Sequence, residues 1–484
     1  MSGSHWSLTE PVPKDLDRRM AAASRVHLVG VGGAGMSGIA RLLLDRSGPV
    51  SGSDAQVSQT TAALAARGAR ISIGHRAAAV DGAGVVVVSS AVRENNPEVL
   101  AARAAGIPLV HRSVALAALM AADTAVTVTG THGKTTTTSM ITVAARACGL
   151  DVSYAIGADL AADGVNARLG TAGVFVAEAD ESDGSFRAYH PGVCVVGNVE
   201  ADHLDHYGSV AAIEAAFASL AQGIAPQGLA IAGADDAGAR RWAASVAAAR
   251  ADVRVLHVGR DPGNDVVITD LTARGGAVAM QVTAGPQVGG GADVSITLAV
   301  PGRHNATNAA LAWTACVAGL GLDPRRVAAG LADFTGARRR FERRGTAAGV
   351  LVVDDYAHHP TEVRATISAA RDVSTGGSVH VLFQPHLYSR TRLFAADFAD
   401  ALATADSVVA LDVYAAREDP EPGVDGGLVI RGVAAGRFVP DRAAAVAAVA
   451  AAARPGDVVL TLGAGDVTEL VPAVLDALGA AAPS

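Results

Sequence analysis

The chain has 484 residues, half of them hydrophobic, which is enough for about two to four domains with sizeable cores. Its formal net charge of -8 argues against nucleic acid as the main partner. The sequence has no apolar run as long as a membrane span, no signal-peptide pattern at its start and no metal-ligand spacing among its three cysteines, and we therefore expect a cytoplasmic protein.

Short apolar runs alternate with Ala-rich helical stretches along the chain, a pattern that predicts α/β segments with mostly parallel sheets. We expect a flexible polar tail over residues 1–24, followed by domains at 25–120, 121–336 and 337–484. The Gly-rich segment 283–295 is predicted to be a surface hairpin loop. Polar clusters follow many of the expected strands, and that edge of a parallel sheet is where ligands bind.

The first expected strand runs into GVGGAGMSG, which contains Gly30-x-Gly32-x-x-Gly35. Small residues let the backbone approach a pyrophosphate, and the start of the following helix favours its charge. Asp54 follows at the distance of a ribose-binding acid. The pattern is typical of a nicotinamide dinucleotide site, but a tight turn without a ligand has the same signature.

The second expected segment opens with TVTGTHGKTTTT, in which two residues separate Gly130 from Gly133. A Walker A loop has four residues there. The loop still lies between a strand and a helix, so its backbone N–H groups are expected to face phosphate oxygens. Lys134 is placed to reach the β- and γ-phosphates and Thr135 to hold Mg²⁺. The alternative is a Thr-rich helix cap, which the rarity of lysine in this chain disfavours: lysine occurs only at positions 14 and 134.

Acidic residues and histidines follow two later strands of the same segment. Glu178 ends the strand in VFVAEADESD, where a Walker B acid would lie. The motif NVEADHLDHYGS supplies Glu200, Asp202 and His203 among its polar residues. These side chains are candidates for a second Mg²⁺ site or for orienting substrate, although Asp202 equally fits a helix cap.

Two further motifs are candidates for nucleotide contacts. PGRHNATNAA places His304 and Asn308 at the head of a helix, where amide groups suit an adenine edge. FTGARRRFERR is a basic stretch at the second expected joint, where Arg338 and Arg339 would clamp the γ-phosphate if they are not simply solvated.

Taken together, the motifs resemble those of a known family. In chain order they are GVGGAGMSGIA, TGTHGKTTTT, EADESDGSF, NVEADHLDHYGS, GRHNATNA, FTGARRRFE, DDYAHHPTEV, FQPHLYSRT and DVYAAREDPEPGV. They resemble the ATP-dependent Mur ligases of cell-wall synthesis, and the last motifs resemble the alanine-adding branch. The resemblance extends from about residue 25 to the C-terminal region, and the Gly-x-x-Gly-Lys-Thr spacing is shared by the whole family.

The resemblance implies a Rossmann-like N-terminal domain that binds a UDP-sugar, a central P-loop ATPase-type domain with a mostly parallel sheet, and a Rossmann-like C-terminal domain. The implied UDP-sugar residues are Gly32, Gly33, Gly35, Met36, Ser37, Asp54, Ser89 and Ser90. The implied ATP residues are Gly130, Thr131, His132, Gly133, Lys134, Thr135, Thr136, His304, Asn308 and Arg339. The implied metal ligands are Thr135, Glu178 and His203, and the implied amino-acid residues are Tyr356, His358, His386 and Arg390.

The implied reaction joins L-alanine to the lactyl carboxylate of UDP-N-acetylmuramate through an acyl phosphate, with ATP as co-substrate and Mg²⁺, or Mn²⁺ in its place. Lys134, Glu178, His203 and Arg390 are the implied catalytic residues. His203 and His358 both remain candidates for the base that deprotonates alanine. Some Mur ligases hold magnesium with a carbamylated lysine. Lys134 is the sole lysine in the expected folded body of this chain, and its positive charge is needed on phosphate, so we expect no carbamylation here. We expect a monomer or weak dimer.

Three other functions remain open. A nicotinamide-dependent oxidoreductase would explain Gly30 to Gly35 but not the second glycine loop. A nucleotide switch without enzymatic activity would not need the histidines of the third domain. A recycling ligase that attaches a tripeptide to the same sugar nucleotide differs only in its acceptor, and the motif DVYAARE disfavours it moderately.

Overall fold

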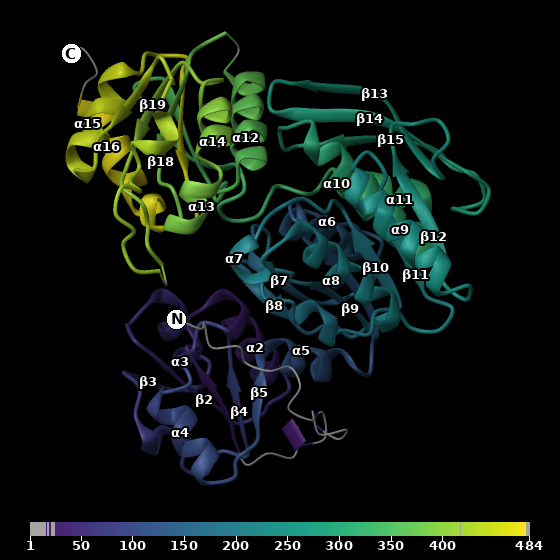
Figure 1. The fold of residues 1–484 in the computed structure, drawn as a ribbon. Helices are drawn as coiled ribbons and strands as arrows, with labels where there is room; N and C mark the ends of the chain where they lie inside the picture. The colour runs from purple at the N-terminus through teal and green to yellow at the C-terminus, as the bar shows by residue number, and fades with distance from the viewer. Residues whose placement is uncertain (1–15, 17–18, 21–24, 375, 417, 481–484) are drawn as a thin grey trace. The chain divides into compact units, whose positions relative to one another are not determined.

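The computed structural model describes residues 16, 19–20, 25–374, 376–416 and 418–480 (Figure 1). Most of the expected tail therefore lies outside the described residues. The chain forms two compact units. The first comprises residues 1–267, 284–292 and 311–330, and the second comprises residues 268–283, 293–310 and 331–484.

The first unit begins with a sheet of five parallel strands in the order β3-β2-β1-β4-β5. Its strands are β1 (Val26–Val29), β2 (Val50–Asp54), β3 (Arg70–Ile73), β4 (Val85–Val88) and β5 (Leu109–His111). Its helices are α2 (Ala34–Asp45), α3 (Gln59–Ala66), η1 (Ala77–Val80), α4 (Pro97–Ala104) and α5 (Arg112–Met120).

Both faces of this sheet are covered at its centre, which explains why β4 is apolar at every position (VVVV). Leu28 and Val87 point to the face that packs on α2 and α5. Val29 and Val88, one position along each strand, point to the face covered by η1 and α4. This alternation is the two-residue period of a strand.

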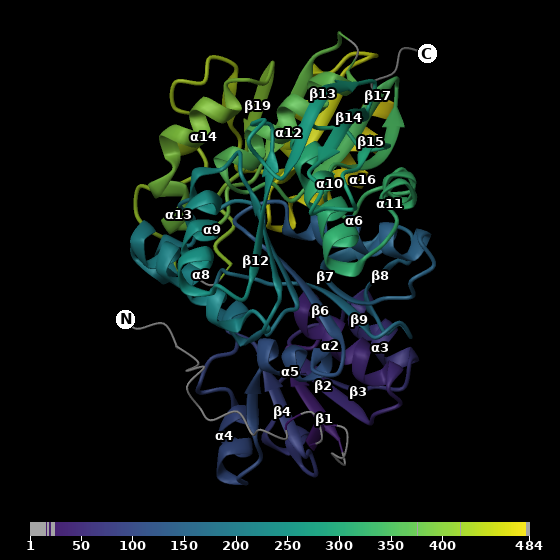
Figure 2. The same cartoon turned by 90° about the vertical axis from the view of Figure 1, so that its right-hand side faces the viewer.

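A second sheet has ten strands in the order β15-β14-β13-β12-β11-β10-β6-β9-β7-β8. Its strands are β6 (Thr124–Thr129), β7 (Ser153–Leu160), β8 (Val165–Arg168), β9 (Val174–Glu178), β10 (Val193–Val196), β11 (Leu229–Gly233), β12 (Arg254–Gly259), β13 (Val266–Arg274), β14 (Ala277–Ala284) and β15 (Asp293–Leu298). The strands β14 and β15 are antiparallel, and β13, β14 and β15 lie side by side in both views (Figures 1 and 2). The predicted Gly-rich hairpin loop is confirmed between β14 and β15.

The helical segments of this part of the chain are α6 (Lys134–Ala147), η2 (Ser185–Ala188), α7 (Leu204–Tyr207), α8 (Val210–Gly223), α9 (Ala237–Ala249), α10 (His304–Thr314), η3 (Ala315–Gly319) and α11 (Pro324–Leu331). Helix α6 forms despite a run of four threonines, which have low helix propensity. The hydroxyls of Thr138, Ser139 and Thr142 each donate to the carbonyl four residues earlier, at 2.8 Å. These bonds let the polar side chains be buried in the helix.

The second unit contains a sheet of six strands in the order β16-β17-β21-β18-β19-β20. Its strands are β16 (Glu342–Ala347), β17 (Val350–Asp355), β18 (Val379–Phe383), β19 (Ser407–Ala410), β20 (Gly436–Phe438) and β21 (Val458–Leu462). Its helical segments are α12 (Pro360–Val373), α13 (Tyr388–Leu393), α14 (Ala395–Leu402), η4 (Leu428–Ile430), α15 (Arg442–Ala452), η5 (Asp466–Leu470) and α16 (Val471–Ala480).

All strands of this third sheet are parallel except β16, which runs antiparallel to β17. Helices α12 and α14 pack on one face and α15 and α16 on the other (Figure 1). The predicted α/β architecture with mostly parallel sheets is therefore confirmed. Among the described residues, no helix combines the length and the apolar character needed to cross a membrane.

Gly233 marks a place where two backbones approach closely. A Cβ atom at Gly233 would lie 2.1 Å from the carbonyl oxygen of Gly197. We predict that Gly233→Ala lowers the free energy of unfolding by at least about 2 kcal/mol, because neither backbone can move without breaking sheet hydrogen bonds. Gly192→Ala is the matched control, since its Cβ would meet Thr124 Cγ2 at an ordinary 3.5 Å. Equal stabilities of the two variants in urea unfolding would contradict this reading.

Asp355, at the end of β17, is buried and accepts hydrogen bonds from the amides of Phe341 and Ala357 at 2.7 and 2.8 Å. Burial raises its pKa from 3.8 to about 6, although the Arg340 charge and these hydrogen bonds oppose the increase. The folded state therefore binds this proton more tightly than the unfolded state. The Asp355 proton therefore contributes fully to the stability of the fold below about pH 4, and this contribution is lost as the pH rises to about 6.

We predict that Asp355→Asn removes this pH dependence from the second unit. Relative to the variant, the free energy of unfolding of the wild type should fall by on the order of 1 to 3 kcal/mol between about pH 4 and 6. Denaturant unfolding at several pH values measures the difference. Asp333→Asn, at an exposed position of the same unit, should follow the wild-type profile. Parallel profiles for the wild type and Asp355→Asn would rule out the effect.

Candidate active site

Three loops of the ten-stranded sheet meet because the strands that precede them are neighbours. Strand β6 has β9 and β10 as its parallel partners. Parallel neighbours end at the same edge of a sheet, where ligands bind. The loop from Gly130 follows β6, the loop from Ala179 follows β9, and the loop from Gly197 follows β10. The structure thus brings together Lys134, Glu178 and His203, which the sequence placed on three separate motifs.

The glycine loop needs both of its glycines. Gly130 has a φ of 133°, and a Cβ atom there would lie 2.9 Å from the Asn198 carbonyl oxygen. Gly133 has a φ of 80° and is the N-cap residue of α6, whose N-terminus is not capped by a side chain. The amides of this helix start therefore face the loop, which is the arrangement that binds phosphate in nucleotide sites.

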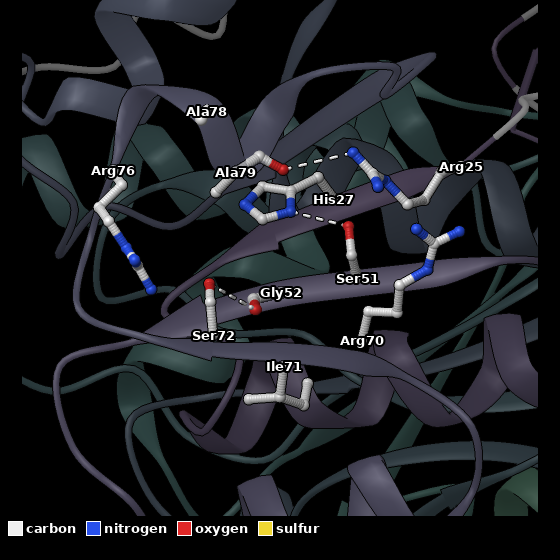
Figure 3. Close-up of a pocket in the computed structure, with 10 residues that line it drawn as sticks. All are labelled: Arg25, His27, Ser51, Gly52, Arg70, Ile71, Ser72, Arg76, Ala78 and Ala79. Atoms are coloured by element: carbon white, nitrogen blue, oxygen red, sulfur yellow. Dashed lines mark hydrogen bonds between the residues drawn. The ribbon is translucent and has the colours of Figure 1, made fainter.

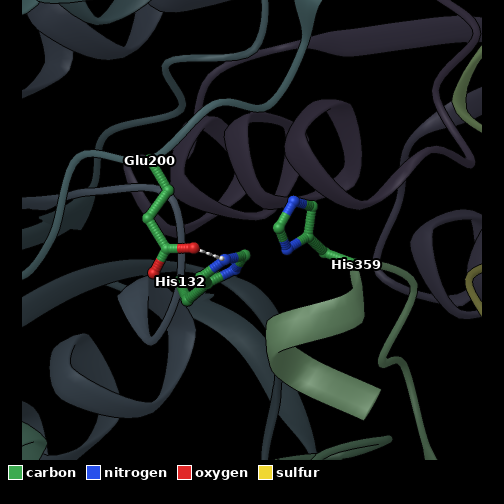
Figure 4. Close-up of side chains that lie close together, drawn as sticks. All are labelled: His132, Glu200 and His359. Carbon is green, nitrogen blue, oxygen red and sulfur yellow. Dashed lines mark ion pairs between the residues drawn. The ribbon is translucent and has the colours of Figure 1, made fainter. Parts of the chain in front are cut away.

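Asn198 fixes the shape of the glycine loop from the end of β10. Its side chain accepts a hydrogen bond from the His132 amide at 2.7 Å and donates one to the His132 carbonyl at 3.1 Å. The Thr131 hydroxyl accepts a hydrogen bond from the Glu200 amide at 2.8 Å, and the Glu200 carboxylate lies 3.6 Å from the His132 ring (Figure 4). Sequence reasoning missed Asn198, although it is the first polar side chain after β10 in a motif that we singled out.

Lys134 lies inside the loop that it follows. Its ammonium donates to the Gly130 carbonyl at 2.8 Å, to the Thr131 carbonyl at 3.1 Å and to the Glu181 carboxylate at 2.9 Å. The side chains of Lys134 and Glu181 are 14% and 3% exposed, so this ion pair is buried. Burial lowers the pKa of Lys134, but Glu181, Asp180 and Glu178 outweigh burial and leave the pKa above its ordinary value. The lysine is therefore an ammonium at neutral pH.

Glu178 is held by the helix start on one side and by β7 on the other. Thr135 Oγ1 donates to its carboxylate at 2.9 Å, and the Gly157 amide donates to the same oxygen at 2.8 Å. A Cβ atom at Gly157 would lie 2.8 Å from both carboxylate oxygens, so β7 needs glycine at this point. Thr135 and Glu178, which the sequence predicts separately as metal ligands, are thus hydrogen-bonded to each other.

His203 lies between two acids. Its Nε2 atom is 3.6 Å from Glu181 and 3.5 Å from the Asp202 carboxylate. Its backbone is left-handed, with a φ of 51°, and its amide donates to the Asp202 side chain at 2.7 Å. This local bond holds the ring towards the Lys134–Glu181 pair.

The cluster offers hard oxygen ligands of the kind that Mg²⁺ prefers. The Thr135 hydroxyl and the Glu178 carboxylate are adjacent, and the Glu181 carboxylate is buried beside them. The residues present therefore fit a magnesium ion. The imidazole of His203 is a softer donor and the weaker ligand for this metal.

A second charged cluster extends from the acidic loop to the start of α5. The Arg112 guanidinium lies 2.7 Å from Asp180 and 3.6 Å from Asp183. The Ser90 hydroxyl donates to Asp183, and the His111 ring lies 3.7 Å from the same carboxylate. Burial, with the Arg112 charge adding to it, lowers the pKa of His111 to about 4, so the ring is neutral near pH 7. Sequence reasoning named Ser90 alone of this cluster, because a single arginine after a strand carries no signal.

The glycine loop of the N-terminal sheet is held by Asp54. The Gly32 amide donates to the Asp54 carboxylate at 2.8 Å, and a Cβ atom at Gly32 would lie 2.8 Å from the same oxygen. The predicted ribose-binding acid thus lies directly beside the loop. The following turn of α2 is fixed by Asn166, which donates to the Ala34 carbonyl at 2.6 Å, while Met36 is buried.

The second unit holds the predicted residues Arg339, His304 and Asn308 and those predicted for the amino acid. The Arg339 guanidinium donates to the carbonyls of Gly463 and Gly465 at 2.6 and 3.2 Å and lies 4.9 Å from the centre of the Tyr356 ring. Arg339 therefore anchors the loop after β21. His304 begins α10, and the Asn308 amide donates to Asn305 at 3.1 Å.

Aromatic rings from three loops of the second unit lie in a row. The centres of Tyr356 and His358 are 5.2 Å apart, those of His358 and His386 are 6.1 Å apart, and the His386 and Tyr414 rings stack at 5.8 Å. Arg390, in α13, is buried. The structure thus groups three of the predicted amino-acid residues and adds Tyr414, which the sequence did not single out.

Three family models match consecutive parts of this chain. The model described as Mur ligase family, catalytic domain, matches residues 25–124. The Mur ligase middle domain matches residues 128–316. The Mur ligase, glutamate ligase domain, matches residues 339–465.

Curated relatives match nearly the full length. A UDP-N-acetylmuramate–L-alanine ligase of Kineococcus radiotolerans is 56% identical over 467 residues, covering 95% of this chain and 97% of the relative. One of Renibacterium salmoninarum is 52% identical over 455 residues, covering 94% and 96%. Among solved structures, the UDP-N-acetylmuramate-alanine ligase of Thermotoga maritima aligns with a TM-score of 0.78 at 26% identity, covering 93% of this chain and 98% of that one. This chain belongs to the Mur ligase family.

Proposed function

We propose that this protein is an ATP-dependent ligase that joins L-alanine to the lactyl carboxylate of UDP-N-acetylmuramate, in the synthesis of peptidoglycan precursors. The observation that carries the proposal is the buried cluster of Lys134, Thr135, Glu178 and Glu181 at the start of α6. The names of the full-length relatives supply the substrates. The proposed domains are 25–120 for the UDP-sugar, 121–336 for ATP and 337–484 for the amino acid and part of the nucleotide.

In the first proposed step, a lactyl carboxylate oxygen attacks the γ-phosphorus of ATP. The bond between that phosphorus and the bridging oxygen breaks, and its electron pair leaves with ADP. Two anions must approach each other, so the main barrier is electrostatic. Lys134 supplies a cation that remains charged at neutral pH. We infer that its ammonium exchanges Glu181 for a phosphate oxygen of the nucleotide.

Magnesium, held by Thr135 and Glu178 with His203 as a weaker ligand, would neutralise charge on the phosphates. The loop amides around Gly133 would bind the phosphate oxygens, and the surrounding hydrogen bonds from Asn198 keep that loop in place before ATP arrives. Preorganised donors of this kind cost no rearrangement during the reaction.

In the second proposed step, the amine of L-alanine attacks the acyl carbon and phosphate leaves from the tetrahedral intermediate. The ammonium of alanine must first lose a proton, and both His203 and His358 are candidates for that base. His358 lies beside Glu362, with its Nδ1 atom 3.2 Å from the carboxylate. Tyr356, His386 and Arg390 are the proposed amino-acid residues.

The acceptor specificity is tested by ADP release with UDP-N-acetylmuramate as donor. We predict turnover with L-alanine, and at least about tenfold lower kcat/KM with the tripeptide acceptor of recycling ligases. Hydroxylamine added without alanine should yield the hydroxamate of the lactyl group. A preference for the tripeptide would reassign the chain to the recycling reaction, and the absence of any hydroxamate would exclude the acyl phosphate.

Removing the ammonium of the glycine loop should stop the chemistry. We predict that Lys134→Ala lowers kcat on the order of 10²-fold or more, because a preorganised charge is lost from a phosphoryl-transfer site. Lys14→Ala, which removes the other lysine, should leave kcat unchanged.

Loss of the ion-pair partner also leaves Glu181 buried without its cation, which costs about 3 kcal/mol of stability or more. The variant Lys134→Met/Glu181→Gln removes both charges and separates folding from catalysis. If this folded double variant releases ADP at near the wild-type rate, Lys134 is not catalytic.

A further inference from the structure

The N-terminal sheet has a second polar site that the proposed ligase reaction does not use. A pocket of about 300 Å³ lies over the first residues of β1, β2 and β3. The glycine loop and Asp54 lie at the other ends of β1 and β2, about 10 Å along the strands from His27 and Ser51. The pocket is therefore at the opposite edge of the sheet from the proposed UDP-sugar site.

Three arginines line this pocket. Figure 3 shows Arg25 and Arg70 on one side and Arg76 on the other, with a histidine and two serines between them. Arg25 donates to the carbonyls of Ala79 and Asp81. The guanidinium groups of Arg70 and Arg76 form no hydrogen bond or ion pair with any residue in the described part of the chain.

A buried polar network forms the floor of the pocket. His27, which is 1% exposed, contacts the Ser51 hydroxyl at 2.8 Å and the Glu98 carboxylate at 3.5 Å. The other Glu98 oxygen accepts a hydrogen bond from the Arg76 amide at 3.2 Å. Burial raises the pKa of Glu98, but hydrogen bonds from His27, Ser53 and Arg76 outweigh it and keep the carboxylate ionised. This single buried acid positions His27 and the backbone of Arg76.

The arginine charges of the pocket are only partly compensated. The Glu98 carboxylate contacts the floor from below, whereas three guanidinium groups surround the opening. Burial and the neighbouring Arg70 charge both lower the pKa of Arg25, and Asp81 opposes them. The like charges of Arg25 and Arg70 thus repel each other on one side of a pocket lined by polar groups. An anion placed between them would relieve this repulsion.

We propose that this pocket binds a small anion with a phosphate group, separately from ATP and the UDP-sugar. Arginine forks match the geometry of phosphate oxygens and bind them in pairs of hydrogen bonds. The Ser72 hydroxyl adds a polar group on the strand side, while the His27 ring beneath it is engaged by Ser51 and Glu98. The volume suits a phosphate monoester and is too small for a whole sugar nucleotide.

The test is calorimetric titration of the full-length protein with inorganic phosphate and, separately, with glycerol 1-phosphate. Both titrations are made with an unhydrolysed ATP analogue, Mg²⁺ and UDP at saturation, so that the glycine loops are occupied. We expect one site with a dissociation constant in the millimolar range or below. Tighter binding of the ester identifies an organic phosphate as the ligand, and equal binding identifies the free ion.

Arg70→Ala/Arg76→Ala should weaken this binding about tenfold or more, since each lost arginine removes a charged hydrogen bond. Arg103→Ala, an exposed arginine of the same sheet's helix α4, is the matched control for charge and should bind as the wild type does. Basal ligase activity at saturating substrate should be the same in all three proteins, which shows that they fold. Absence of binding to the wild type, or equal binding by the double variant, overturns the proposal.

Discussion

The buried ion pair between Lys134 and Glu181 is the interaction on which the rest of the site depends. A buried charge is costly unless it is paired, so the lysine can point into the loop only because an acid from the loop after β9 meets it there. The same acid lies beside His203. The pair thus connects all three loops of the sheet edge. It also keeps the Lys134 ammonium at the place where phosphate charge must be neutralised.

The order of strands explains why these loops meet. Because β9 and β10 flank β6 and run parallel to it, their ends are fixed relative to the glycine loop by backbone hydrogen bonds. The side chains of these loops then need few further contacts to keep their positions. Asn198 ties the loop to β10 through two hydrogen bonds, and Glu178 ties the helix start to β7. The scaffold therefore sets the positions of the charges before any substrate binds.

Much of the fold and of the candidate site could be predicted from the sequence, because strand ends and glycine spacing are local features. The parallel sheets, the glycine loop, and the choice of Thr135 and Glu178 as candidate metal ligands follow from apolar runs and motif position. The choice of Glu181 as the lysine's partner did not follow, because it depends on the turn after β9, where Asp180 accepts a hydrogen bond from the Ser182 amide at 3.0 Å. The role of Arg112 could not be predicted from the sequence either, since its partners lie 68 residues or more away in the chain. The grouping of residues 268–283 and 293–310 with the second unit is likewise a property of packing that chain order does not reveal.

Lys134 should remain an ammonium when ATP binds and exchange its Glu181 carboxylate partner for a phosphate oxygen. The chain has two lysines, so ¹⁵N-lysine labelling gives two Nζ signals, and the variant Lys14→Arg assigns them. The measurement is the ¹⁵Nζ spectrum at neutral pH, with and without an unhydrolysed ATP analogue and Mg²⁺, in buffer containing ¹³C-bicarbonate. We expect a protonated Lys134 signal that shifts when the nucleotide binds, and no carbamate carbon. A neutral amine, a lysine carbamate or a signal that does not respond to the nucleotide would contradict it.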